Sequence, residues 1–231
     1  MKSDRQWRAY RAICAGRWAA ACARALAASR LTLILSGCLW LGACSVLDKP
    51  TRAQVYDFGL GVQSTAPTPL AGLPALALAE VEAASAFDSS AMLYRLAYAN
   101  AQQLSPYAQA RWSMPPAQLL RQRLRESIGQ RWIVISASDA LVALASAPNV
   151  LHLELEEFSQ VFDAPDSSAG LVRVRATLVR PTVGGDSLLA QRSFVAQRAA
   201  PSADAAGGVR ALTAASDAVV EEIGLWLTQI R

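Results

Sequence analysis

The chain has few of the residues on which metal and redox sites usually depend. Its four cysteines all lie within the first 44 of 231 residues, so residues 45–231 contain none. This distribution argues against disulfides, Cys-based zinc sites and thiol redox chemistry in the long C-terminal part. His152 is the only histidine, and the sequence lacks a Gly-x-Ser-x-Gly elbow, a phosphate-binding glycine loop and a His-Glu-x-x-His motif. We therefore expect no enzyme, no cofactor and no metal site.

Long hydrophobic runs are missing as well. The apolar stretch that follows Arg30 is about 13 residues long, which suits a secretory signal and is too short to span a membrane. Seven basic residues and one acidic residue precede it, as in a signal peptide: Lys2, Asp4, Arg5, Arg8, Arg11, Arg17, Arg24 and Arg30.

The sequence Leu41-Gly42-Ala43-Cys44 ends this apolar stretch and resembles the lipobox of bacterial lipoproteins. Small residues before the cysteine admit a signal peptidase, and the thiol receives a diacylglyceryl group, so Cys44 would begin the mature chain. A second match ends at Cys38 but leaves only Leu31 to Leu35 as apolar core, less than an export signal needs. The remaining alternative is that Cys44 is an ordinary small apolar residue at the end of a signal, or a buried thiol.

The formal net charge of +4 comes from the leader, because residues 44–231 contain 15 Lys and Arg against 17 Asp and Glu. No basic nucleic-acid surface is therefore expected. The 188 residues that remain suffice for one domain. We expect a signal peptide over 1–43, a lipidated Pro/Gly-rich tether over 44–73, and a folded domain over 74–231. A short apolar patch at Val55–Phe58 predicts a docking strand near Val55–Leu60 within the tether.

Hydrophobic periodicity predicts an α+β domain with a mostly antiparallel sheet and two helices packed on one face. Strands are expected near residues 55–60, 76–84, 92–98, 132–136, 150–162, 172–178 and 187–197. The last three are expected to form an antiparallel meander. In the strand over 150–162 the apolar alternation slips between Leu155 and Phe158, which predicts a bulge at Glu156-Glu157. Helices are expected from Pro115 to Gln130, with Arg121, Arg123 and Arg125 mostly exposed, and from Ala205 to Ile230.

A few residues could be interpreted as carriers of chemistry. His152 lies on the same predicted strand face as Glu154 and Glu156 and could act as a base, but a solvated strand face is the more economical interpretation. The two carboxylates on that face offer too few ligands for a divalent cation, because Glu157 points to the opposite face. The three arginines could bind phosphate groups, although a solvated helix face is preferred. Trp112, Trp132 and Trp226 are expected in the core or in an interface.

Three segments in a fixed order resemble a known family. They are Met92-Leu93-Tyr94-Arg95, then Tyr107-Ala108-Gln109-Ala110-Arg111-Trp112, and then Pro115-Pro116 with Leu119 and Leu120. Together with the lipobox and the C-terminal helix, they resemble the auxiliary lipoproteins of ABC-type intermembrane lipid transporters, which include the PqiC-type outer-membrane lipoproteins.

The resemblance implies a non-enzymatic subunit of a lipid transport system. Its partners would be a periplasmic MCE-domain protein and the associated inner-membrane ABC permease and ATPase. It would sit on the periplasmic face of the outer membrane of a Gram-negative bacterium. The resemblance also allows a homo-oligomeric ring. Ser45 after Cys44, rather than an aspartate, agrees with sorting to the outer membrane.

Within this resemblance, Tyr107, Arg111 and Trp112 are predicted to lie in a loop before a helix and to contact a partner or subunit. The alternative is that Trp112 caps the core beneath the first helix. Two other functions share the anchor, the tether and a small α+β domain. One is an envelope assembly lipoprotein for lipopolysaccharide or β-barrel proteins, and the other is a lipid-anchored hydrolase, which the missing nucleophile disfavours.

Overall fold

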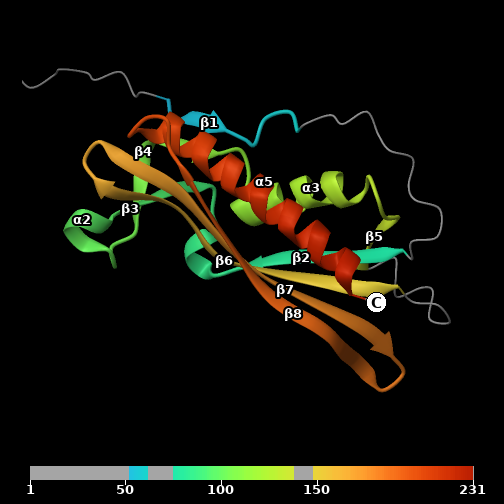
Figure 1. Ribbon diagram of the computed structural model, residues 1–231. Coiled ribbons are helices and arrows are strands. Elements are labelled where there is room, and N and C mark those ends of the chain that lie inside the picture. The colour runs from blue at the N-terminus through green and yellow to red at the C-terminus, as the bar shows by residue number, and fades with distance from the viewer. Residues whose placement is uncertain (1–51, 62–74, 138–147, 231) are drawn as a thin grey trace, which may run out of the picture. The chain divides into compact units, whose positions relative to one another are not determined.

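A computed structural model describes residues 52–61, 75–137 and 148–230 of the chain. The lipobox with Cys44 and most of the predicted tether lie outside these residues. The described strands are β1 (Gln54–Tyr56), β2 (Leu76–Ala83), β3 (Ala91–Leu96), β4 (Ser105–Trp112), β5 (Val134–Ser136), β6 (Asn149–Ala164), β7 (Ser167–Thr182) and β8 (Gly185–Ala199) (Figure 1). The helices are the 3-10 turn η2 (Ser85–Phe87), α2 (Ala97–Asn100), α3 (Pro116–Ile128) and α5 (Ala205–Gln229). No helix among the described residues is long and apolar enough to cross a membrane.

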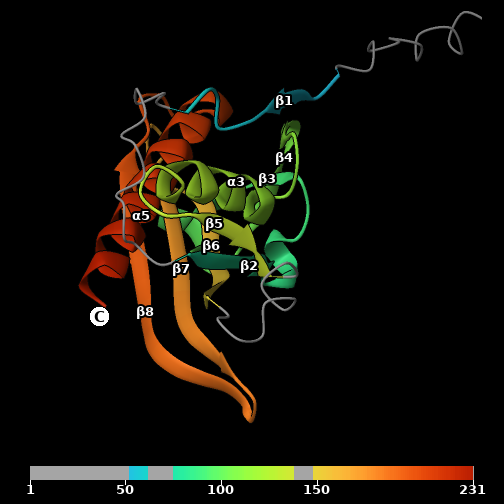
Figure 2. The same cartoon turned by 90° about the vertical axis from the view of Figure 1, so that its right-hand side faces the viewer.

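The long strand β6 is the centre of the sheet. On one side it pairs with β7 along almost its whole length, and β8 continues the sheet beyond β7. On its other side β6 meets two strands in succession: β2 pairs with residues 149–155 and β3 with residues 160–162. The strand β5 extends the sheet beyond β2, and β4 and then β1 extend it beyond β3 (Figures 1 and 2).

The prediction of a mostly antiparallel sheet is wrong, because four of the seven strand pairings are parallel. These are β1 with β4, β2 with β5, β2 with β6 and β3 with β6. Alternation of apolar residues shows which face of a strand is buried, but it carries no information on which strand lies beside it. The predicted meander of β6, β7 and β8 is confirmed. The short helix α2 was not predicted, and it ends the β3 strand at Leu96.

The predicted bulge in β6 is confirmed. Leu155 pairs with Val174 and Glu157 pairs with the adjacent Arg173, so Glu156 is an extra residue in the ladder. The shift lets Leu151, Leu153, Leu155 and Phe158 all contribute to one buried core. Without the bulge, Phe158 would point to the opposite sheet face from the three leucines.

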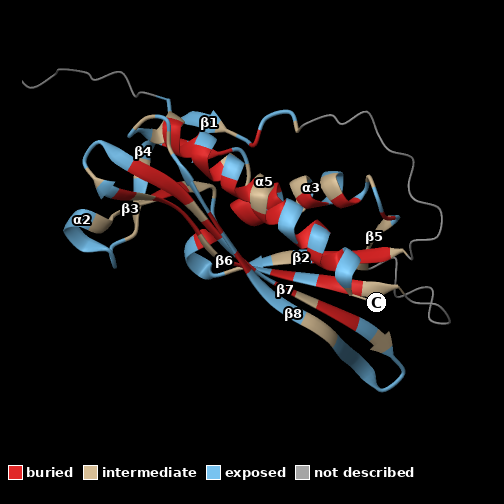
Figure 3. Ribbon diagram, viewed as in Figure 1, coloured by how far each residue is buried: buried red, intermediate tan, exposed pale blue. Residues whose placement is uncertain are grey.

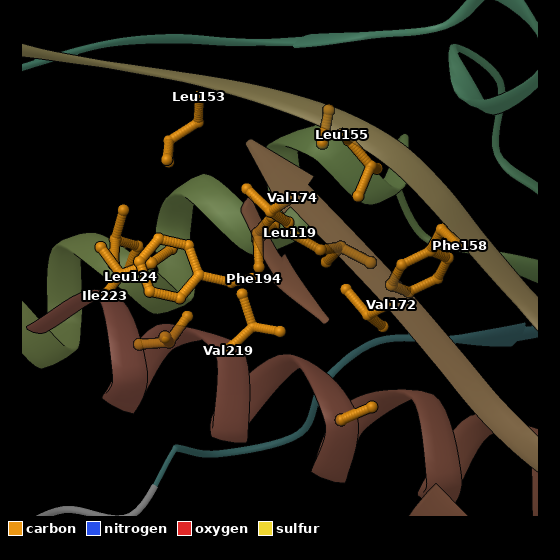
Figure 4. Close-up of a cluster of buried hydrophobic side chains, with 14 of the residues drawn as sticks. Leu119, Leu124, Leu153, Leu155, Phe158, Val172, Val174, Phe194, Val219 and Ile223 are labelled. Carbon is orange, nitrogen blue, oxygen red and sulfur yellow. The ribbon is translucent and has the colours of Figure 1, made fainter. Parts of the chain in front are cut away.

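Helices α3 and α5 pack on one face of the sheet, as predicted. The helix α3 begins at a proline, where the missing N–H has no partner to lose, and buries Leu120, Leu124 and Ile128. The helix α5 crosses β7 and β8 and buries Val219 and Ile223, among others (Figure 3). In Figure 4, side chains of α3 and α5 interdigitate with side chains of β6, β7 and β8.

The crossing of α5 over the sheet requires a glycine. A Cβ atom on Gly170 of β7 would lie 2.5 Å from the main-chain nitrogen of Leu212 in α5. Backbone therefore meets backbone at this point, and no other residue type fits without moving the helix.

The opposite face of the sheet carries a smaller apolar cluster of Ala77, Ala79, Val150 and Val179. Ala77, Val150, Val179 and Leu188 form part of one row across β2, β6, β7 and β8. Exposed polar residues on that face include His152, Glu154, Arg173 and Arg175, and the apolar Val195 is also exposed there.

Candidate functional site

The three residues predicted to contact a partner lie on strand β4, not in a loop. The loop prediction is wrong because Pro106 and four polar residues between Gln102 and Gln109 mask the strand pattern. The ladder between β3 and β4 is itself irregular. Ala91 pairs with Arg111, whereas Leu93, two residues on, pairs with Pro106. Such an insertion removes the regular alternation on which a strand prediction depends.

Trp112 belongs to the core. It is 1% exposed, and its ring meets those of Phe58 and Phe158 edge-on, with centroids 5.7 Å and 5.5 Å apart. Its indole Nε1 is buried and has no hydrogen-bond partner among the described residues. This burial agrees with the interpretation that Trp112 caps the core beneath α3. Trp132 and Trp226 are also buried, as expected for core residues.

Tyr107 is half-buried and joins a polar contact that holds two elements together. Its hydroxyl donates to Gln160 Oε1 at 2.9 Å, and its ring lies 4.7 Å from the ring of Tyr94. The pKa of Tyr107 is raised to about 12, chiefly by burial and further by the nearby Tyr94 and Asp204. The phenol therefore stays protonated over the whole physiological pH range and acts as a donor.

Gln160 is fully buried and links β6 to the start of α5. Its side-chain nitrogen donates to Ser168 Oγ at 2.8 Å and to the carbonyl of Asp204 at 3.2 Å. Asp204 is the N-cap of α5 and accepts from the Gly207 N–H at 2.7 Å, which together with the Ser202 hydroxyl lowers the pKa of its carboxyl. This network satisfies the polar groups of a buried amide and fixes the position of the helix.

Arg111 is exposed, and it pairs in the parallel ladder with Val55 of β1. The structure therefore separates the three predicted contact residues. Trp112 lies in the core, Tyr107 is hydrogen-bonded to Gln160, and Arg111 faces solvent. Only Arg111 and the open part of Tyr107 are available to another chain.

A second feature was only partly visible in the sequence: residues 54–61, which we call the docked segment, lie against the folded domain. The predicted docking strand is confirmed as β1, shorter than expected, and it adds to the edge of β4. The Phe58 ring is 8% exposed and inserts beside Trp112 and Phe158. The Ser113 N–H donates to the Tyr56 carbonyl at 2.7 Å.

Arg123 of α3 fastens the docked segment from the other side. Its Nη2 donates to the Phe58 carbonyl at 2.5 Å, and its guanidinium lies 5.9 Å from the centroid of the Phe58 ring. Its Nε lies 3.2 Å from Asp217 Oδ1 of α5. Burial raises the pKa of Asp217, and Arg123 opposes this shift. The prediction that Arg123 is mostly exposed is wrong, because its side chain is only 10% exposed.

Two open grooves flank the docked segment. One of about 470 Å³ lies between residues 55–59 and the first half of α5, and its lining includes Val55, Val209, Ala214 and Asp217. The other, of about 380 Å³, lies between Gly61, the end of α3 and the middle of α5. Both are lined by a mixture of apolar and charged side chains.

The residues considered for catalysis or metal binding do not converge. His152 is exposed, Glu154 and Glu156 both pair with Arg175, and Glu157 pairs with Arg95 at 3.0 Å on the other side of the bulge. In the described ranges no group of three or more His, Cys, Asp or Glu residues could hold a metal ion. Arg121 pairs with Glu80 at 2.9 Å, and Arg125 is exposed.

Comparison with known proteins places this architecture in a family. Residues 56–224 match the family model of the ABC-type transport auxiliary lipoprotein component. The chain belongs to this family. The match begins at the last residue of β1 and ends in α5, so it covers strands β2 to β8 and most of α5. No curated protein matches the chain.

Solved structures share the fold at low sequence identity. The crystal structure of protein XCC0632 from Xanthomonas campestris is 19% identical, with a TM-score of 0.56, and the similarity covers 75% of this chain and 94% of that protein. The crystal structure of an uncharacterized protein is 17% identical, with a TM-score of 0.56, and the similarity covers 76% of this chain and 99% of the other. These similarities show that the described domain shares the fold of both proteins.

Proposed function

We propose that the chain is a non-enzymatic outer-membrane lipoprotein that docks a periplasmic MCE-domain protein in an ABC-type intermembrane lipid transport system. The observation that carries the proposal is the family match over residues 56–224, combined with the lipobox that ends at Cys44. Membership in the family implies that the partner belongs to an ABC-type transport system. The outer-membrane position and the MCE protein are the specific parts of the proposal.

The described domain suits a binding role. The phenylalanines and tryptophans of its described residues are buried, and the carboxylates considered for chemistry are engaged by arginines. A rigid domain of this kind offers a surface on a fixed scaffold, which is what a docking subunit requires. We assign the partner contact to Arg111, with the exposed part of Tyr107 beside it. In this proposal Trp112 supports β4 from within the core and does not touch the partner.

The proposal includes assembly of several copies into a ring. Strand β8 supports this part, since it has 15 residues and no described strand pairs with its outer side. Leu188 and Val195 on β8 are 62% and 51% exposed. Long open edge strands with exposed apolar residues favour association with another chain.

Localisation tests the anchor directly. Cys44→Ala should release the protein from the outer-membrane fraction into the soluble periplasmic fraction, because the acyl chains supply the membrane affinity. The matched control is Cys38→Ala, which removes the second lipobox cysteine and should leave the protein in the outer membrane. Release by Cys38→Ala, and not by Cys44→Ala, would mean that Cys38 is the lipidated residue.

The partner contact is tested by crosslinking in the envelope. Arg111→Ala should reduce recovery of the MCE protein, whereas Arg131→Ala, which removes another exposed arginine, should not. Equal recovery in both variants would remove Arg111 from the interface. Recovery of lipopolysaccharide or β-barrel assembly factors in place of the MCE protein would favour the envelope assembly function.

A further inference from the structure

The docked segment sets the number of residues between Cys44 and the first strand of the folded domain. Cys44 lies ten residues before Gln54, the first residue of β1, and 32 residues before Leu76, the first residue of β2. We infer that docking of residues 54–61 shortens the working tether to the stretch between Cys44 and β1, so that the domain is held close to the membrane. The inference rests on the proposed lipid anchor at Cys44 for its meaning, although its test does not need the membrane.

The docked segment is held by main-chain pairing and by a buried side chain, as other strands of the domain are. The three residues of β1 are in register with Ala110–Trp112 of β4, and the Phe58 ring completes an aromatic cluster with Trp112 and Phe158. Main-chain pairing and burial of a large ring at the same place hold both the backbone and a side chain.

Two hydrogen bonds of the segment and one supporting ion pair add to these contacts. Arg123 of α3 donates to the Phe58 carbonyl, and its ion pair with Asp217 of α5 holds the guanidinium in place. Asp57 Oδ1 accepts from the Gly59 N–H at 2.7 Å, and Gly59 has a φ of +66°, a conformation that glycine adopts without strain. The chain thus turns immediately after Phe58, where an extended tether would continue straight.

The geometric consequence is large. A fully extended chain spans about 3.3–3.6 Å per residue, so ten residues can span at most about 35 Å and 32 residues at most about 110 Å. Docking therefore reduces the maximum distance between the lipid anchor and the domain about threefold. A partner that bridges two membranes meets the domain within a narrow range of heights.

Insertion of the same flexible segment on either side of the docked segment tests the inference. Twenty Gly/Ser residues are placed between Arg52 and Ala53 in one variant and between Ser64 and Thr65 in the other. Spin labels on Val46→Cys and Val183→Cys report the distance from the start of the tether to the β7–β8 turn. Residues 45–231 contain no native cysteine. An unlipidated Cys44 would also take a label, but that label would lie only two residues from position 46.

We expect the upstream insertion to lengthen and broaden the distance distribution, since the root-mean-square span of the free chain rises about 1.9-fold when eight residues become 28. The downstream insertion should leave the distribution unchanged, because it enlarges only a loop whose two ends are fixed. Equal lengthening by both insertions would overturn the inference.

A second pair of variants identifies the fastening residue. Phe58→Ala, added to the downstream insertion, should allow that insertion to lengthen the distribution as well. Leu60→Ala is the matched control, because Leu60 lies in the same segment and is 96% exposed. An unchanged distribution with Phe58→Ala would remove Phe58 as the fastening residue. Separate flotation of the protein with lipid vesicles tests the anchor, so failure of the proposed function and failure of the inference give different results.

Discussion

Two glycines of α5 occupy opposite environments at the scale of single residues. A Cβ atom on Gly208 would overlap the side-chain oxygen of the buried Gln160, whereas a Cβ atom on Gly224 would have no heavy atom within 4 Å. We expect Gly208→Ala to destabilise the domain by about 1–3 kcal/mol, because the amide network must shift to admit the methyl group. Gly224→Ala should stabilise it by about 0.5–1 kcal/mol, because alanine loses less backbone entropy in a helix.

Urea unfolding of both variants measures the difference. The thermal unfolding midpoints of the two variants should show the same order, with a shift of about 2–4 °C for each kcal/mol of unfolding free energy. Equal stabilities of the two variants would mean that Gly208 does not need to be glycine and that the contact between α5 and Gln160 is looser than described.

Asp204 predicts a pH dependence. Its pKa is lowered in the folded state, first by the hydrogen bond from the Gly207 N–H. A depressed pKa contributes stability that is present above the unfolded value of about 3.9 and is lost as the pH falls through the folded value. Asp204→Ala should lower stability at pH 7 and lower it progressively less in acid. Asp204→Asn caps the helix without titrating. The difference in unfolding free energy between the Asn and Ala variants should therefore be the same at pH 7 and in acid.

Trp112 is predicted to act through packing alone. Trp112→Ala should cost about 3–5 kcal/mol, since it removes a fully buried ring from the cluster with Phe58 and Phe158. Trp112→Phe should cost less, because an aromatic ring remains and the lost Nε1 has no described hydrogen-bond partner. Denaturant unfolding of the two variants checks this order. A well-folded Trp112→Ala that fails to recover its partner would instead restore Trp112 to the interface.

The attachment of β1 to the sheet is a property of one element and can be probed alone. The Ser113 N–H donates to the Tyr56 carbonyl, so its exchange with solvent reports whether the docked segment is in place. Phe58→Ala should speed hydrogen exchange at Ser113, because segments with fewer buried contacts open more often. Leu120, at the centre of the core, should exchange at an unchanged rate in the same experiment. Equal acceleration at both positions would indicate loss of global stability and not release of β1.

Most elements could be predicted from their local patterns. The stripes of α3 and α5 and the slip between Leu155 and Phe158 are properties of contiguous residues, and all are confirmed. The parallel pairing of β2 and β3 with β6 could not be predicted, because it joins segments about 70 residues apart through surfaces that look alike in sequence. Strand β4 was missed because its ladder contains an irregular insertion.

The candidate site was predicted less well than the elements. Phe58 lies in the short apolar patch that predicted a docking strand, so sequence alone located this feature. Arg123 was assigned to an exposed helix face with its neighbours, although its position next to Leu124 places it at the boundary of the buried stripe. Nothing in the sequence distinguishes the arginine that fastens the docked segment from Arg125, which is exposed.

At the scale of the whole molecule, the proposal combines a lipid anchor at Cys44, a tether before β1 and a rigid domain that presents Arg111 and an open β8 edge. Each part alone is compatible with several envelope functions. Membership in the ABC-type transport auxiliary lipoprotein family favours the lipid transport system among them. The docked segment adds a limit on how far the domain can stand from the membrane.

The most direct test of this account is crosslinking followed by affinity purification of the lipidated protein from Gram-negative envelopes. The account predicts that an MCE-domain protein is recovered with the native chain, and that Cys44→Ala both loses the outer-membrane position and reduces this recovery. Recovery of barrel or lipopolysaccharide assembly factors, with no MCE-domain protein, would contradict it.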